Sequence, residues 1–240
     1  MPPVRNLLLA SLPHKAAKLL LPQLTPVELA FGEVLYEAGQ PMREVYFPLD
    51  GLVSLLTLVG SRLALEVAMV GREGMVGIPL ALGLSRSPMR ALVHGAGTGL
   101  RMSKASFDQA MEHTPALRKA LLGYAGSLMA QIARTAACNR FHVVEARLAR
   151  WLLMTRDRTG SADLVMTQEF LSSMLGVRRV GVSEAASTFQ RRKLIEYSRG
   201  RIRIVDHAGL ESACCTCYGD EPAALPPWRP ESSAAAPPTS

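Results

Sequence analysis

Few features of this chain suit a secreted or membrane-spanning protein. It has only four cysteines in 240 residues, three of them between positions 214 and 217, which does not resemble a disulfide framework. The apolar stretch near the N-terminus, residues 7–21, is interrupted by a proline, a histidine and two lysines, so it is too short and too broken to cross a membrane. No signal peptide is evident. We expect a cytoplasmic protein in which residues 7–21 form an amphipathic helix packed on the domain behind it.

Catalytic patterns are also missing. Metal-dependent enzymes built on β-rolls need clustered histidines, and the five here are scattered (His14, His94, His113, His142 and His207). No Ser–His–Asp arrangement and no glycine loop suited to cradling a phosphate stands out. We predict that the chain is not an enzyme.

What the chain does have is enough apolar sequence for two cores. Its content of 48% apolar and 20% charged residues is typical of a globular protein, and its length suffices for two ordinary domains. From residue 26 to residue 103, short apolar runs alternate with glycines, which predicts an antiparallel β-roll or sandwich. The expected strands are Val34–Tyr36, Val45–Pro48, Leu52–Leu58, Leu63–Val70, Ala91–Val93 and Gly99–Met102.

The hydrophobic period becomes helical after Ser103, which can cap a short helix through Met111. Pro115 then starts a second helix. Its large apolar residues recur at steps of four and three, like the a and d positions of a coiled coil: Leu117, Leu121, Tyr124, Leu128 and Ile132. Such a stripe packs either on its own domain or on a second copy of the chain, and we predict that it forms a dimer interface. A further helix is expected over Phe141–Arg158.

Residues 167–182 have the pattern of two short helices around a tight turn. Thr167 is a good N-cap, and Gly176 suits the left-handed position that ends a helix. The apolar stripe resumes at Val177 and continues to Phe189. This pattern predicts a helix-turn-helix whose second helix carries its reading residues near its N-terminus, followed by a β-hairpin wing within the sequence SRGRIRIVD.

Positive charge is concentrated in the same region. Eight basic and two acidic residues stand between Arg178 and Arg203, a net charge of +6, while the whole chain carries +7. Basic runs alone are usually solvated faces, but beside a helix-turn-helix this concentration indicates binding to DNA phosphates. The candidate DNA-binding residues are Thr167, Gln168, Arg178, Arg179, Val180, Ser183, Arg191, Arg199, Arg201 and Arg203.

The segment FGEVLYEAGQPMREVYFPLDGLVSLL, residues 31–56, resembles the opening of a cyclic-nucleotide-binding β-roll. With the long helix and the winged helix-turn-helix after it, the chain up to about residue 218 resembles the Crp/Fnr family of transcription regulators. The resemblance implies an α+β fold with a sensor domain over residues 1–112, a dimerisation helix over 113–138 and a DNA-binding domain over 139–218. Residues 219–240, rich in proline, are expected to be disordered.

The same resemblance implies how such a protein acts. Family members are typically bacterial homodimers on a two-fold operator, with half-sites about 34–36 Å apart. An effector in the β-roll shifts the DNA-binding domains, and activators also contact RNA polymerase. Arg179 matches the family's base-reading arginine, whereas Val180 stands where a glutamate is usual. The operator sequence is therefore not carried over from relatives.

The cyclic-nucleotide cassette departs from the family pattern. Ile78 stands in place of the glutamate that holds the ribose, and Met89 in place of the arginine that pairs with the cyclic phosphate. We do not expect cyclic AMP to bind, and Gly77, Ile78, Met89 and Arg90 are the candidate pocket for an unknown effector. A cyclic-nucleotide-dependent regulator and an effector-independent one are the alternatives.

No metal or other cofactor is assigned from the sequence. The family's oxygen sensors ligate an iron–sulfur cluster through cysteines near the N-terminus, and this chain has none before Cys138. The run Cys214-Cys215-x-Cys217 offers thiolates that suit soft metal ions. The sequence shows no fourth ligand beside these three cysteines, however.

Overall fold

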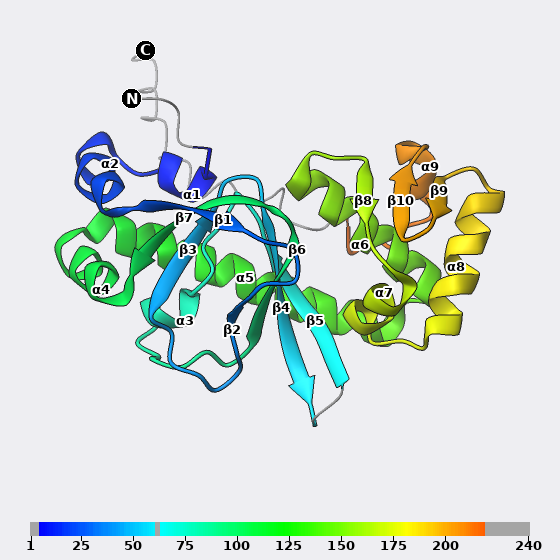
Figure 1. Cartoon of the computed structure of the whole chain (residues 1–240), viewed down its shortest axis with the longest axis horizontal. Helices are drawn as coiled ribbons and strands as arrows, with labels where there is room; N and C mark the ends of the chain where they lie inside the picture. Colours follow the sequence, from blue (N-terminus) through cyan, green and yellow to red (C-terminus); the bar gives the residue numbers. More distant parts are fainter. Residues whose placement is uncertain (1–4, 61–62, 219–240) are drawn as a thin grey trace, which may run out of the picture.

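The computed structural model describes residues 5–60 and 63–218, and Figure 1 shows a β-rich lobe beside a smaller, mainly helical one. The tail predicted to be disordered, residues 219–240, lies outside the described residues. The chain opens with α1 (Leu7–Ala10), α2 (His14–Leu20) and a turn of 3-10 helix, η1 (Leu21–Gln23). The prediction of a single helix over residues 7–21 is therefore wrong. Pro13 has no N–H with which to continue α1, and it is instead the residue that precedes α2. The expected packing is confirmed, since leucines of both helices are buried in the core of the β-rich lobe.

Two antiparallel sheets make up the β-roll. One has the strand order β1 (Thr25–Leu29), β7 (Gly97–Ser103), β3 (Glu44–Pro48); the other has the order β2 (Val34–Tyr36), β6 (Arg90–Gly95), β4 (Leu52–Val59), β5 (Leu63–Val70). All six expected strands are present. Strand β1 is not among the predicted strands. It contains Pro26 and most of its residues are exposed, so its sequence lacks the alternation of apolar and polar residues that predicts a strand. A short helix, α3 (Ile78–Ala81), lies between β5 and β6.

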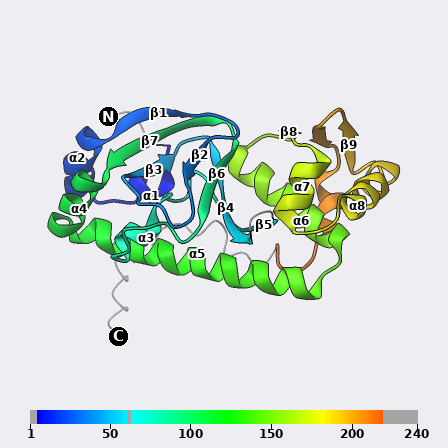
Figure 2. The same cartoon turned by 60° about the horizontal axis from the view of Figure 1, so that its bottom comes forward.

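Helices α4 (Lys104–His113) and α5 (Pro115–Phe141) follow the roll. Ser103 caps α4 as expected, since its Oγ accepts a hydrogen bond from the N–H of Ser106. Figure 2 shows α5 running along one side of the molecule, from the β-roll to the helical lobe. It continues past the expected end at residue 138, and α6 (Val144–Thr159) starts at Val144 rather than at Phe141. Only two residues separate these helices.

The apolar stripe of α5 is packed against the β-roll of its own chain. Leu117 and Leu121 are fully buried, Tyr124 and Leu128 are nearly so, and Ile132 packs against the same core. Leu117, Leu121, Tyr124 and Leu128 are therefore not available for the predicted dimer interface, whereas the assignment of the half-buried Ile132 to that interface stays a prediction. The β-roll has an apolar face that must be covered, and α5, the second helix after the roll in the chain, covers it.

The helical lobe is a winged helix-turn-helix. It contains α6, β8 (Asp163–Val165), α7 (Gln168–Leu175), α8 (Arg179–Arg191), β9 (Ile195–Ser198), β10 (Arg201–Ile204) and α9 (His207–Ser212), with the strands in the order β8-β10-β9. Thr167 caps α7 by accepting a hydrogen bond from the N–H of Phe170 at 3.1 Å. Gly176 ends α7 with φ 61°, so the turn predicted from the sequence is confirmed.

A second hydrophobic core joins the two lobes. Besides residues of α6, α7, α8 and α9, it contains Leu52 and Leu56 of β4 and Met69 of β5. The helical lobe is thus seated on the β4–β5 side of the roll. Among the described residues, no helix combines the length and the apolar character needed to cross a membrane.

Candidate functional site

The start of α7, the start of α8 and the turn of the wing converge on one surface of the helical lobe. The hollow between them has a volume of about 500 Å³ and is lined by Thr167, Gln168, Glu169, Arg179, Gln190, Tyr197, Ser198, Arg199 and Gly200. Four predicted DNA-binding residues are therefore brought together here. Gln190, Tyr197 and Ser198 are not among the predicted residues, because only the folding of β9 against α8 brings them to the hollow.

Hydrogen bonds hold the polar side chains around this hollow. Ser183 Oγ donates to Gln168 Oε1 at 2.7 Å, which ties α8 to the first turn of α7. Gln190 Nε2 donates to the carbonyl oxygen of Tyr197 at 3.2 Å, which ties α8 to the wing. Arg179 lines the same hollow and is exposed. The helix that carries Arg179 is therefore fixed in place by hydrogen bonds to α7 and to the wing.

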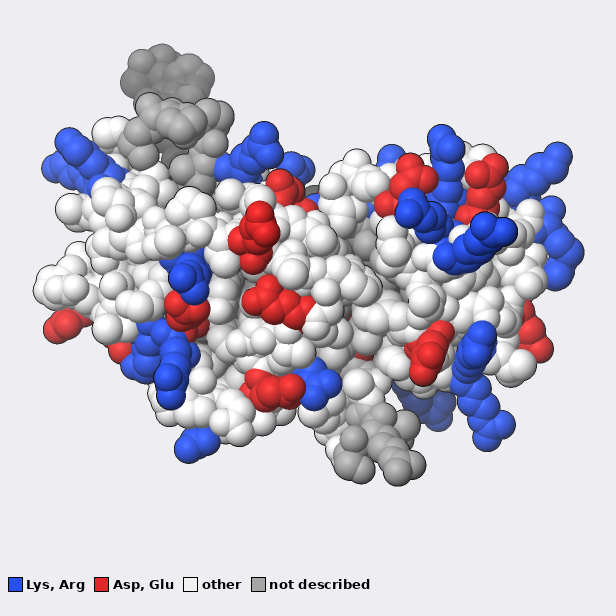
Figure 3. All heavy atoms as spheres, in the orientation of Figure 1, with Lys and Arg blue, Asp and Glu red and all other residues white. Residues whose placement is uncertain are grey.

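The cationic side chains face outward around the hollow. Strand β10 alternates in burial, so Arg201 and Arg203 are exposed while the isoleucines between and after them are buried. The predicted residues Arg178, Arg191 and Arg199 are also exposed, and Val180 is 63% exposed. Figure 3 shows basic side chains along the outer end of this lobe, with a few acidic groups among them. One of the nearby acidic groups is Asp163, whose Oδ1 lies 3.9 Å from Arg203 Nε.

Residues 146–213 match the family described as the Crp-like helix-turn-helix domain. About 80% of the chain also resembles solved structures in its fold. The chain has the Crp/Fnr fold. FixK2 from Bradyrhizobium japonicum superposes with a TM-score of 0.66 at 15% identity, over 80% of this chain and 98% of that one. The CRP-family regulator TTHB099 from Thermus thermophilus gives 0.64 at 21% identity, over 80% and 96%.

A third match is CLP from Xanthomonas campestris, described as a c-di-GMP-responsive global regulator. Its TM-score is 0.66 at 14% identity, over 80% of this chain and 99% of that one. A search of curated proteins gives no significant sequence match. The resemblance to the Crp/Fnr family and the α+β fold class predicted from the sequence are confirmed.

A candidate sensor cavity lies between the β-roll and α5. It has a volume of about 160 Å³ and is lined by Tyr36, Leu55, Met75, Gly77, Ile78, Pro79, Leu82, Leu84, Ser87, Pro88, Met89, Ala125, Leu128, Met129 and Ile132. Three of the four predicted pocket residues line it. Arg90 does not, because its guanidinium makes two hydrogen bonds to the Glu37 carboxylate, at 2.9 and 3.0 Å, outside the cavity.

The cavity offers a ligand almost no polar side chain with which to form a hydrogen bond. Only two lining side chains are polar, and both hydroxyls donate to backbone carbonyls: Tyr36 to Glu44, and Ser87 to Met89 at 2.6 Å. Burial raises the pKa of Tyr36, so this hydroxyl stays neutral. Gly77 is fixed at φ 111°, and a Cβ there would lie 2.9 Å from the Tyr36 hydroxyl. A cavity of about 150 Å³ accommodates benzene, so cyclic AMP, which is much larger and anionic, does not match it in size or polarity.

A buried polar cluster lies where the two lobes meet. Glu66 on β5 accepts hydrogen bonds from Ser54 Oγ and from Trp151 Nε1 of α6. Ser54 Oγ also lies 2.5 Å from His94 Nδ1. Burial raises the pKa of Glu66 to about 7, an effect that these hydrogen bonds only partly offset. Burial lowers the pKa of His94 to about 3.

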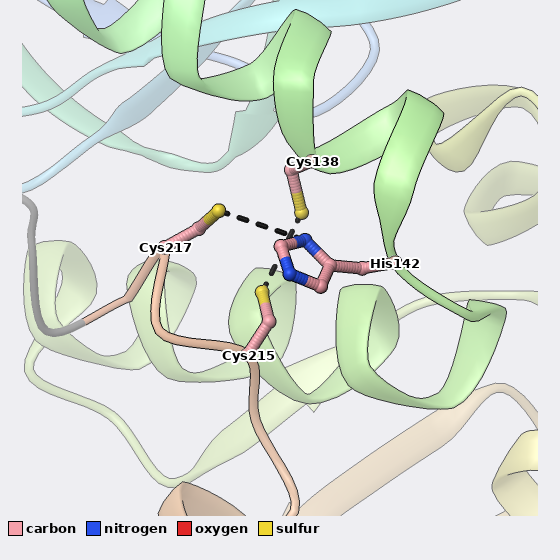
Figure 4. A group of neighbouring side chains, drawn as sticks. All are labelled: Cys138, His142, Cys215 and Cys217. Atoms are coloured by element: carbon pink, nitrogen blue, oxygen red, sulfur yellow. Dashed lines mark hydrogen bonds between the residues drawn. The ribbon is translucent and has the colours of Figure 1, made fainter.

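Three cysteines and a histidine meet at the end of α5, as Figure 4 shows. They are Cys138, His142, Cys215 and Cys217, and one ligand atom from each lies within 4.8 Å of the others. The sequence interpretation that no further ligand accompanies the C-terminal cysteines is therefore wrong. Cys138 lies in the last turn of α5 and His142 is the C-cap of that helix, four residues later. Cys215 is 77 residues away from Cys138, so only the fold reveals the group.

Proposed function

We propose that this chain is a sequence-specific DNA-binding transcription regulator that acts in the cytoplasm as a homodimer on a two-fold operator. The observation that carries the proposal is the convergence of exposed arginines from α8 and the wing around one hollow of a Crp-like helix-turn-helix domain. The N-terminus of α8 would enter the major groove, and the wing would follow the backbone.

The contacts divide by chemistry. Arg179, exposed at the start of α8, suits a bidentate contact with the O6 and N7 atoms of a guanine. Val180 beside it can offer only apolar contact, for example to a thymine methyl group. Arg199, Arg201 and Arg203 extend from the wing and suit phosphates, which position the domain without reading sequence.

The homodimer would form through the other face of α5. That face is exposed along the helix and consists mainly of small or apolar residues at steps of three and four: Leu122, Gly126, Met129, Ala133 and Ala137. Leu122 is 49% exposed and Met129 is 65% exposed, which is unusual for large apolar side chains on a long helix. Small residues between them would allow a second copy of α5 to approach closely. Half-sites would then lie about 34–36 Å apart.

The cavity supports an effector that is small and apolar rather than a nucleotide. Met129 belongs both to the cavity lining and to the exposed face of α5. A ligand that moves Met129 would therefore change the proposed dimer contact, and so the relative orientation of the two recognition helices.

Selection of binding sites from random duplex DNA with the purified full-length protein tests the proposal, with and without cyclic AMP and cyclic GMP. We expect a palindromic motif in every arm. A motif that requires a nucleotide would overturn the apolar-effector assignment and leave DNA binding intact. Absence of any motif, together with equal affinity for wild type and an Arg179→Ala, Arg199→Ala double variant, would overturn the assignment of this surface to DNA.

A further inference from the structure

We propose that Cys138, His142, Cys215 and Cys217 form a closed tetrahedral site for a thiolate-preferring divalent metal ion, with Zn²⁺ as the best-fitting ion. Three thiolates and one imidazole are a usual ligand set for structural zinc. The proposal does not depend on DNA binding, because it rests on the geometry of these four side chains alone.

The distances within the group suit such a site. The sulfurs of Cys138 and Cys215 lie 3.5 Å apart, and the sulfur of Cys217 lies 3.7 Å from Nδ1 of His142. With Zn–S bonds of about 2.3 Å and Zn–N bonds of about 2.0–2.1 Å, the edges of a tetrahedron measure about 3.6–3.8 Å. The sulfurs are also too far apart for a disulfide bond, which needs about 2.05 Å.

Each ligand pair is placed by local structure. Cys138 and His142 are four residues apart at the C-terminal end of α5 and project to the same side, toward the segment that follows α9. Cys215 and Cys217 lie on that segment, and Figure 4 shows the sulfur of Cys217 directed at the imidazole and that of Cys215 at the sulfur of Cys138. All four cysteines of the chain are free thiols.

The surroundings fit a closed site. Cys138 is 1% exposed, Cys215 is 9% exposed and Cys217 is 8% exposed, so the three sulfurs are shielded from solvent. Three thiolates around Zn²⁺ carry a net charge of −1, and two buried guanidinium groups of α6, from Arg147 and Arg150, lie close enough to Cys138 to interact with it electrostatically. The charge of an occupied site would thus be offset within the fold.

Cys214 is not part of the group. Its sulfur lies 3.8 Å from the carbonyl oxygen of Ala146 on α6. It is a thiol of the same segment, directly beside Cys215, and so provides a matched control.

An occupied site would connect two parts of the molecule. Only His142 and Val143 separate α5 from α6, while Cys215 and Cys217 follow the last helix of the DNA-binding lobe. The metal would hold the C-terminal end of that lobe against the end of α5. It would thereby restrict how far the lobe can rotate about the two-residue connection.

The test measures metal in the full-length protein, purified without a metal-affinity tag. Elemental analysis should give one zinc per chain. The metal-free, reduced protein should bind one equivalent of Co²⁺ with the intense thiolate-to-metal absorption of tetrahedral cobalt, which Zn²⁺ displaces. Cys215→Ser should weaken Zn²⁺ binding at least about 100-fold, whereas Cys214→Ser should bind as the wild type does.

His142→Gln provides a second variant, because this side chain is only half-buried and its loss should leave the fold intact by circular dichroism. It should bind Co²⁺ more weakly and with an altered absorption spectrum. The proposal is overturned if the folded wild type binds no stoichiometric Zn²⁺ or Co²⁺, or if Cys214→Ser loses as much affinity as Cys215→Ser. Iron with inorganic sulfide in the purified protein would overturn the assignment to Zn²⁺.

Discussion

The indole Nε1 of Trp151 donates a 2.7 Å hydrogen bond to Oε1 of Glu66, and this bond connects the helical lobe to the β-roll. A second link lies nearby, where the guanidinium of Arg158 and the carboxylate of Glu73 are 3.1 Å apart and both side chains are more than nine-tenths buried. Buried polar pairs tolerate little displacement, because stretching a hydrogen bond or ion pair away from water costs free energy that solvent does not restore. The two lobes are therefore held in one relative orientation in this state.

Stability should depend on pH through Glu66. Its pKa is near 4.5 in the unfolded chain and about 7 in the folded one, because burial disfavours the carboxylate. The stabilisation from the protonated carboxyl is complete below pH 4.5 and is lost as the pH rises to 7. At about 1.4 kcal/mol per pKa unit, the loss is on the order of 3 kcal/mol. Glu66→Gln should therefore gain stability relative to wild type as the pH rises from 4.5 to 8 in denaturant titrations.

The comparison between variant and wild type isolates Glu66 from His94. Below pH 6.5 the unfolded chain protonates His94 while the folded chain keeps it neutral, so this residue opposes Glu66 over part of the range. Both proteins contain His94, and its contribution largely cancels. Glu28→Gln, on the exposed part of β1, is the control and should keep the pH slope of wild type. A constant stability difference between Glu66→Gln and wild type across the range would refute the assignment.

Replacing the base-reading arginine should reduce specificity. Arg179→Ala is expected to cost about 1–3 kcal/mol of specific binding and to relax selection at one base position, because a bidentate contact to guanine is lost. Competition binding with the selected operator and its single-base variants measures both effects. Arg192→Ala, just beyond the end of α8, serves as the control and should leave base preference unchanged. Unaltered selectivity of Arg179→Ala would mean that another residue reads that base.

The wing arginines should act through charge. Arg201→Gln and Arg203→Gln should each flatten the dependence of log affinity on log salt by about 0.9 if each side chain neutralises one phosphate. Arg199 has φ 48°, so Arg199→Asn is the suitable neutral variant because asparagine tolerates this backbone conformation. Arg118→Gln, exposed on α5 and far from the wing, is the reference. A salt slope that stays at the wild-type value would count against phosphate contacts by the wing.

Charge on the exposed face of α5 should prevent dimerisation without unfolding the chain. A Cβ at Gly126 would meet no atom within 4 Å, so Gly126→Glu fits the single chain and removes a poor helix former. In the proposed dimer it would bury a carboxylate, which we expect to weaken association at least about tenfold. Sedimentation of dilute protein measures this, with Gly126→Ala as the control that keeps the interface small and uncharged. Dimers of equal strength in both variants would place the interface elsewhere.

The sequence predicts the helix-turn-helix closely because its signals are local. Thr167, Gly176 and the apolar stripe up to Phe189 fix the bounds of α7 and α8 through capping and periodicity. The strands of the β-roll follow from apolar runs between glycines in the same way. Strand β1 is missed because an edge strand that contains Pro26 carries little of that signal.

Features that depend on distant partners are predicted less well. The periodicity of α5 correctly identifies a buried stripe, but periodicity says nothing about which surface buries Leu121 or Tyr124, and that surface is the roll of the same chain. Likewise, an arginine such as Arg90 suits an anion-binding site, but its guanidinium is hydrogen-bonded to the carboxylate of Glu37, which lies 53 residues away in the chain. The four-ligand group has a local clue in Cys138 and His142 at helical spacing, and its other half comes from the opposite end of the DNA-binding lobe.

The hydrophobic core shared by the lobes has a consequence for protein engineering. Leu52, Leu56 and Met69 complete the interior of the DNA-binding lobe, so a fragment that starts at α6 would expose apolar surface that the roll normally shields. We expect such a fragment to aggregate rather than to work as an isolated DNA-binding domain. Chimaeras with other regulators would need to exchange strands β4 and β5 together with the winged helix-turn-helix. Residues of these strands form part of its hydrophobic core.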